Sequence, residues 1–178
     1  IVKRWKRGQP LAEAVTVFEA QRQDVYAWVS VDHTPGFERT SFGRATSFYS
    51  NQLFLLQGEK QLPIDKPADA KLAFWREHLL LELRSDWASA GRSWPRGSLL
   101  VADATAYLKG GATLEALFTP TATRSLAGTS TTRSQVLLNV LDNVAGRAEA
   151  WSRDAVGQWT KRDIPAPYPG TLAVHGLH

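Results

Sequence analysis

The chain has 178 residues, of which 43% are hydrophobic and 10% aromatic, and its 21 basic and 17 acidic side chains give a net charge of +4. These values predict a folded chain with a packed core and argue against intrinsic disorder. No stretch approaches the ~20 consecutive apolar residues of a membrane helix, so we expect no membrane association. The sequence has no cysteine, which excludes disulfides, thiolate metal sites and a cysteine nucleophile and leaves a cytoplasmic or a periplasmic location open.

Basic residues gather near the start of the chain, at Lys3, Arg4, Lys6 and Arg7. No basic stripe with interleaved aromatic residues follows, so we expect a solvated surface segment and no nucleic-acid binding. The first residue is Ile1 and no signal peptide is recognisable, which predicts that the sequence is part of a longer polypeptide.

Alternating apolar and polar residues predict β-strands, because neighbouring side chains of a strand point to opposite faces of its sheet. A first strand is expected at 14–19. Four consecutive antiparallel strands are then expected at 25–31, 37–48, 53–56 and 60–64. In the first of these four, Val25, Ala27, Val29 and Val31 share one face, and both faces can be buried.

The same unit is predicted twice more. Strands of the second copy are expected at 71–75, 78–84, 98–102 and 114–118, and those of the third at 125–130, 135–141, 147–151 and 159–164. Asp103 is a good helix N-cap and Gly110 a good stop, which predicts a short helical insertion at 103–110. A further first strand is expected from Gly170 to Val174, within a segment that runs to His178.

These first strands are spaced by about 47, 54 and 45 residues, as in four-stranded propeller blades. We therefore predict an all-β fold of antiparallel four-stranded blades, a partial β-propeller of about three to four blades. The expected blades are 24–64, 71–118 and 125–164; residues 14–19 would be the outer strand of a preceding blade and 170–178 the inner strand of the next. A β-sandwich stays open, because alternation alone does not distinguish stacked sheets from radial blades. Open blade faces also predict that the isolated chain self-associates or is marginally stable.

No catalytic constellation is recognisable. Gly-x-Ser-x-Gly is absent, and the nearest segment, Gly91 to Pro95, has the wrong last residue and lies in an expected turn. The histidines lack metal-ligand spacing, and Asp32 to Gly36, which includes His33, is a turn sequence. Glu77, Glu82 and Asp86 are expected to pair with arginines or to be solvated. We expect no catalytic, cofactor-binding or metal-binding residue in this chain.

Ser152 to Trp159 resembles the Asp-box of sialidase-type propellers, with glycine and tryptophan displaced from their usual spacing. Asp-boxes lie between the third and fourth strands of a blade, which is where the strand assignment places this segment. The resemblance implies a turn-stabilising role without catalytic meaning.

Five segments together resemble the N-terminal region of prolyl oligopeptidase family serine peptidases of a bacterial branch. They are KRWKRGQPLAEA at 3–14, HTPGFER at 33–39, WREHLLLELRSDW at 75–87, PRGSLL at 95–100 and VLLNVLD at 136–142. The resemblance implies a seven-bladed β-propeller that covers a C-terminal α/β-hydrolase domain. The family's catalytic serine, aspartate and histidine belong to that domain, and no position here matches them.

Two functions of different class follow. The first is a non-catalytic propeller portion of a serine oligopeptidase, which would cover the active site of the hydrolase domain and restrict entry to short peptides. The second is an independent propeller-like module that binds proteins or peptides, because a fold by itself allows many functions. Both predict that this chain alone is inactive as a peptidase.

Overall fold

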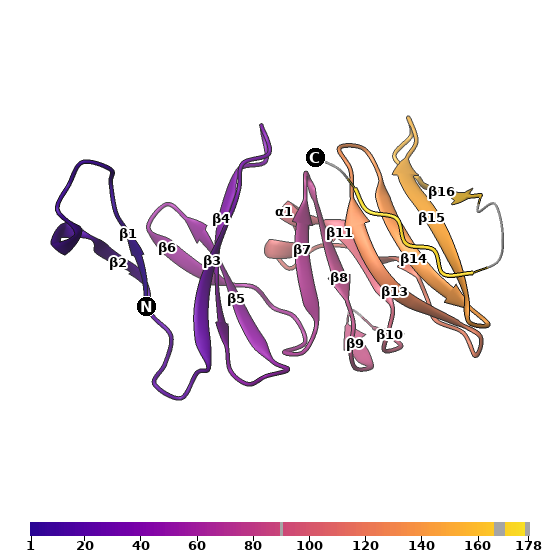
Figure 1. The fold of residues 1–178 in the computed structure, drawn as a ribbon, viewed down its shortest axis with the longest axis horizontal. Coiled ribbons are helices and arrows are strands. Elements are labelled where there is room, and N and C mark those ends of the chain that lie inside the picture. Colours follow the sequence, from indigo (N-terminus) through magenta and orange to yellow (C-terminus); the bar gives the residue numbers. More distant parts are fainter. Residues whose placement is uncertain (90, 166–169, 177–178) are drawn as a thin grey trace. The chain divides into compact units, whose positions relative to one another are not determined.

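The structure is a computed structural model and describes residues 1–89, 91–165 and 170–176. It divides into two compact units, residues 1–70 and residues 71–178, both built from antiparallel β-sheets (Figure 1). Each unit is described by itself below.

The first unit contains a two-stranded hairpin and a four-stranded sheet. The hairpin pairs β1 (Val2–Arg4) with β2 (Val15–Phe18), and the 3-10 turn η1 (Leu11–Glu13) lies between them. The sheet has the strand order β3-β4-β5-β6, from β3 (Tyr26–Asp32), β4 (Arg39–Ala45), β5 (Asn51–Gln57) and β6 (Lys60–Pro63).

Local hydrogen bonds set the ends of these strands. Thr34 N–H donates to the Asp32 carboxylate at 2.9 Å, and Phe37 N–H donates to the Thr34 carbonyl at 2.8 Å, which closes the turn before β4. At the other end of β4, the residues of the 46–50 loop bond to one another, as in the Thr46 N–H to Ser50 carbonyl bond of 3.0 Å. The strand expected at 37–48 is therefore shorter at both ends.

The second unit begins with a sheet of order β12-β11-β8-β7. Its strands are β7 (Lys71–Trp75), β8 (His78–Glu82), β11 (Leu99–Asp103) and β12 (Glu115–Phe118). Between β8 and β11 the chain forms a small hairpin of β9 (Trp87–Ser89) and β10 (Arg92–Trp94), where the sequence predicted only a turn. The expected insertion is the helix α1 (Ala104–Leu108), and Asp103 caps it by accepting a 2.7 Å hydrogen bond from Ala106 N–H.

The last sheet has the order β13-β14-β15-β16. Its strands are β13 (Arg124–Thr131), β14 (Val136–Asp142), β15 (Ala145–Arg153) and β16 (Trp159–Ile164). The described residues 170–176 contain no strand, although a first strand was expected there. They bond instead to this sheet, because the Asn139 amide donates to the Val174 carbonyl at 3.0 Å and accepts from the Val174 N–H at 2.7 Å. Their assignment to another blade stays a prediction, and 177–178 lie outside the described residues.

The core of the second unit lies between its two four-stranded sheets. Leu80, Leu99 and Val101 of one sheet pack in one cluster with Val136 and Leu138 of the other, and all five are buried. Burying a leucine or valine fully contributes about 1.5–3 kcal/mol, so this apolar contact is what stabilises the pair of sheets.

The predicted fold class is confirmed. The described chain is nearly all-β, its three larger sheets are antiparallel with four strands each, and it has one short α-helix. In each of these sheets the strands lie side by side in chain order, so that every sheet is complete before the next begins.

Candidate functional site

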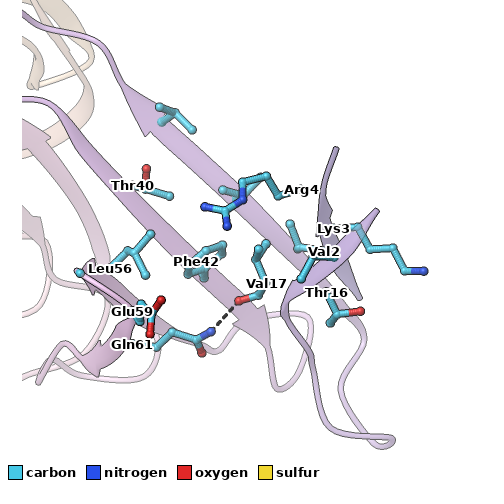
Figure 2. A pocket seen from close by; sticks show the side chains of 14 residues that line it. Val2, Lys3, Arg4, Thr16, Val17, Thr40, Phe42, Leu56, Glu59 and Gln61 are labelled. Atoms are coloured by element: carbon cyan, nitrogen blue, oxygen red, sulfur yellow. Dashed lines mark hydrogen bonds between the residues drawn. The ribbon is translucent and has the colours of Figure 1, made fainter. Parts of the chain in front are cut away.

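The first unit contains a groove with a volume of about 490 Å³. The β1–β2 hairpin forms one wall and the β3–β6 sheet the other (Figure 2). The lining side chains are mostly apolar or small, which follows from the alternation along each strand. They belong to Val2, Lys3, Arg4, Val15, Thr16, Val17, Val29, Val31, Thr40, Phe42, Leu56, Gly58, Glu59 and Gln61.

The hairpin is anchored to the sheet at one side of this groove. Phe18 stacks on Phe42 with ring centroids 5.1 Å apart and planes 6° apart, and it also contacts Phe54 at 5.4 Å. The Gln61 side chain donates a hydrogen bond to the Val17 carbonyl (Figure 2). Because Phe18 and Phe42 are buried, this side is closed.

The other side of the groove is open. Val29 is 43% exposed and Val31 is 49% exposed, so the face that could be buried on sequence grounds is partly uncovered in the described chain. The lining contains no histidine, serine or aspartate that could act as a nucleophile or a nearby base. Its valine, leucine and phenylalanine side chains offer an apolar surface that charged side chains border at Arg4 and Glu59.

A second cavity, of about 310 Å³, lies in the second unit beside His78. His78 is 3% exposed and forms a cluster of three rings with two tryptophans, with centroids 5.8 Å from Trp75 and 5.3 Å from Trp159, while the two tryptophan rings are 6.1 Å apart. The Trp75 indole donates to the Thr132 carbonyl at 2.8 Å, which fixes the ring across the two sheets of this unit. Asp103, Glu115 and Arg153 also line the cavity.

Burial lowers the pKa of His78 below its ordinary value, against the opposing effect of the Glu77 carboxylate. The two side chains are 3.6 Å apart, from His78 Nε2 to Glu77 Oε1. His78 is therefore a neutral ring at pH 7. No serine or cysteine lines this cavity, so it lacks the nucleophile that a catalytic triad requires.

The carboxylates singled out in the sequence have structural partners. Glu82 pairs with Lys71 at 3.4 Å, Glu77 pairs with Arg76 at 3.4 Å, and Asp86 accepts a 2.7 Å hydrogen bond from Arg96 N–H.

The segment from Gly91 to Pro95 lies in and after the β9–β10 hairpin, apart from any strand-to-helix turn. His33 follows β3 in a turn, His175 lies in the 170–176 segment, and His178 is outside the described residues.

The Asp-box-like segment forms the turn between β15 and β16. Asp154 accepts hydrogen bonds from Val156 N–H at 3.0 Å and Gln158 N–H at 2.8 Å. Arg153 donates to the Gly157 carbonyl at 2.7 Å, and Gly157 has a positive φ of 82°. This network orders the turn that leads into Trp159, as the resemblance implied.

In the described ranges no group of three or more histidine and carboxylate side chains could hold a metal ion. Searching the same ranges for a membrane-spanning helix also finds none of sufficient length and apolar character.

Comparison of sequences relates the chain to peptidases. It is 28% identical over 184 residues to an uncharacterized peptidase of Sinorhizobium fredii, an alignment that covers 98% of this chain and 25% of the relative. It is 30% identical over 181 residues to an uncharacterized peptidase of Rickettsia prowazekii, covering 94% of this chain and again 25% of the relative. The chain thus spans about a quarter of the length of these curated relatives. No family model matches the chain.

Comparison of structures gives the same relationship. A post-proline cleaving enzyme from Rickettsia typhi matches 93% of this chain with a TM-score of 0.84 and 27% sequence identity, and the match covers 26% of that enzyme. A structure from a study of two prolyl endopeptidases matches 94% of the chain with a TM-score of 0.64; at 12% identity this likeness concerns the fold alone. The resemblance seen in the five sequence segments is confirmed, and the fold is that of a partial propeller.

Proposed function

Since nearly the whole chain matches one quarter of peptidases of the prolyl oligopeptidase family, we propose that it is a non-catalytic β-propeller portion of such a serine oligopeptidase. In this proposal a separate α/β-hydrolase domain of the same protein supplies the catalytic serine, aspartate and histidine. The propeller covers that active site and admits short peptides only.

The main support for the proposal is that the structural match includes nearly all of this chain but only a small part of the matched enzyme. The alignment with the Rickettsia typhi enzyme covers 93% of this chain and only 26% of the enzyme. Neither of the two cavities described above is lined by a serine, which agrees with a catalytic serine located elsewhere.

The test uses the full-length protein of the parent gene and the chain 1–178. We expect the gene to encode Gly-x-Ser-x-Gly followed by an aspartate and a histidine, and the full-length protein to cleave a short proline-containing peptide. The chain 1–178 should not cleave it. A gene that starts immediately before Ile1 and stops after His178 would instead favour an independent interaction module.

Size restriction is tested in the full-length protein by comparing a short proline-containing peptide with a denatured protein as substrates. Phe18→Ala removes the buried ring that joins the hairpin to its sheet, so we expect it to raise cleavage of the denatured protein relative to the peptide. Replacement of the catalytic serine is the control for contaminating peptidases. Equal cleavage of both substrates by the unmodified protein would contradict the restricting role.

A further inference from the structure

We propose that the cavity beside His78 binds a small zwitterion with an apolar side chain, the chemical class of free amino acids and dipeptides. The ammonium group of the ligand contacts Asp103 and Glu115. Its carboxylate contacts Arg153, and its apolar part packs against Trp159. All of these residues line one cavity of the second unit. The inference concerns binding and does not depend on peptidase activity.

Strand register places two carboxylates on one wall of this cavity. Val101 of β11 packs in the core between the two sheets, and Asp103 lies two residues further along, so both side chains are on the same face. Glu115 of β12 is opposite Val101 in the antiparallel pair, which puts its side chain on that face as well. Asp103 and Glu115 are both exposed, so this wall is acidic at the mouth of the cavity.

The opposite wall carries a guanidinium group beside an indole. Arg153 of β15 and Trp159 of β16 are opposite each other in their antiparallel pair, and the guanidinium carbon is 5.8 Å from the centre of the indole ring. The Nε atom of Arg153 donates to the Gly157 carbonyl at 2.7 Å. This bond positions the guanidinium and leaves its two terminal nitrogens for a carboxylate, which arginine binds through parallel hydrogen bonds.

The charges of the two walls do not neutralise each other. In the part of the chain that the structure describes, no acidic side chain lies within 4.0 Å of the Arg153 guanidinium, and no basic one within 4.0 Å of the Asp103 or Glu115 carboxylate. The space between them is about 310 Å³, which is the size of a small-molecule site. A ligand with both charges would complement both walls, whereas a ligand with one charge would be repelled by one of them.

The floor of the cavity is buried and mostly apolar. Val101 and Ala102 are 1% and 4% exposed, and His78 is also buried. The Nδ1 atom of His78 makes no hydrogen bond of normal geometry with the described residues, so a polar group of a ligand would satisfy it. Because water is excluded from such a floor, contacts between opposite charges above it are stronger than on an open surface. The half-buried indole of Trp159 offers its face to an apolar side chain.

The first experiment measures dissociation constants for the full-length protein by isothermal titration calorimetry. The probes are leucine, leucyl-leucine, leucinamide, which lacks the carboxylate, and N-acetylleucine, which lacks the ammonium group. We expect leucine or leucyl-leucine to bind at least tenfold more tightly than the two singly charged probes, because each missing charge removes charge-assisted hydrogen bonds with one wall.

Two results of this titration would overturn the proposal. If neither leucine nor leucyl-leucine binds, the cavity is not a site for this class of ligand. If leucinamide binds as tightly as both of them, the acidic wall recognises a cation alone and Arg153 has no part in binding.

The second experiment locates the site with one substitution in each wall of the full-length protein. We expect Arg153→Gln to weaken binding of the tighter zwitterion at least tenfold without weakening that of leucinamide. We expect Glu115→Gln to weaken binding of the same zwitterion without weakening that of N-acetylleucine. Arg147→Gln and Glu13→Gln replace exposed side chains of the same types elsewhere and are the matched controls.

Equal dissociation constants for each wall variant and its control would show that the zwitterion binds elsewhere, and the proposal would then be wrong. Misfolding of a variant is recognised separately, because it would abolish binding of every probe and lower the melting temperature. The two wall variants are expected to differ in which singly charged probe they still bind, and loss of fold would not produce this difference.

Discussion

Position 43 requires a glycine because a ring of the neighbouring strand occupies the space of a side chain there. A Cβ atom at this position would lie 2.1 Å from Cζ2 of Trp28, the residue opposite it in the β3–β4 pair. The indole therefore lies flat across the glycine, in space that any side chain would take. No positive φ is involved, so the constraint is purely steric.

We predict that Gly43→Ala destabilises the chain by about 1–3 kcal/mol, because the Trp28 ring must leave its position. Urea unfolding followed by tryptophan fluorescence measures the change. Gly111→Ala is the matched control, since a Cβ there meets no atom within 4 Å. Equal stability of the two variants would mean that Trp28 has another place to pack.

His78 gives the stability of the chain a dependence on pH. Its pKa in the folded chain is lowered by burial, so the unfolded chain binds more protons than the folded chain once the pH falls below about 6.5. Stability should therefore fall as the pH drops from about 6.5 to the folded pKa, and be unaffected by this group above about 6.5.

The test measures the free energy of unfolding of the unmodified chain and of His78→Leu at pH values between about 7.5 and about 5. We expect the unmodified chain to lose more stability than the variant over this range. His33→Leu is the control, because it replaces a histidine in a turn. If His78→Leu retains the full pH dependence, the loss comes from other groups.

At the scale of elements, the 170–176 segment is held by side chains of the last sheet. Asn139 makes both of its hydrogen bonds with the backbone of Val174, and Ser130 accepts a 3.1 Å hydrogen bond from Gly176 N–H. The Gly146 N–H also donates to the Gly170 carbonyl at 2.9 Å, so two side chains and one backbone amide of the sheet hold the segment.

We predict that Asn139→Ala releases this segment while leaving the sheet intact. The Val174 amide should exchange at least ten times faster, whereas the amides of β14 and β15 keep their protection. Gln57→Ala, which removes an exposed amide side chain at the end of β5, is the control. Unchanged exchange of Val174 would show that other contacts hold the segment.

Elements with regular alternation could be predicted from sequence, and short or charged ones could not. The twelve strands of the three larger sheets were expected because apolar residues alternate over several positions and glycine, proline or aspartate follow. The strand β1 was missed because Val2–Arg4 is short and two of its three residues are basic, which favours a solvated segment. The β9–β10 hairpin was missed because three-residue strands carry too little periodicity.

The groove could not be predicted from the alternation of apolar and polar residues. It depends on where the hairpin lies over its sheet, which is decided by the contact of Phe18 with Phe42 across two elements distant in sequence. The cluster around His78 likewise joins residues from β7, β8 and β16. Alternation specifies which side chains share a face and leaves open what covers that face.

At the scale of the whole molecule, the exposed valines at the groove predict association of the isolated chain. Val29, Val31 and the free edge of β1 offer an apolar surface and unpaired backbone groups together. We expect sedimentation of the chain 1–178 to show species larger than a monomer that increase with concentration, and Val31→Asp to reduce them. A monomer at every concentration with one cooperative unfolding transition would contradict this prediction.

The chain order of the strands also bears on how the protein is made. Each large sheet is formed by one uninterrupted stretch of polypeptide, from 26 to 63, from 71 to 118 and from 124 to 164. All the strands of one sheet therefore emerge from the ribosome before the first strand of the next sheet emerges. Since nascent chains grow at about 5–20 residues per second, the next sheet takes about 2–10 s to emerge in full, and the preceding sheet can pair during that time. Synthesis thus separates in time strands of similar pattern that could otherwise pair wrongly.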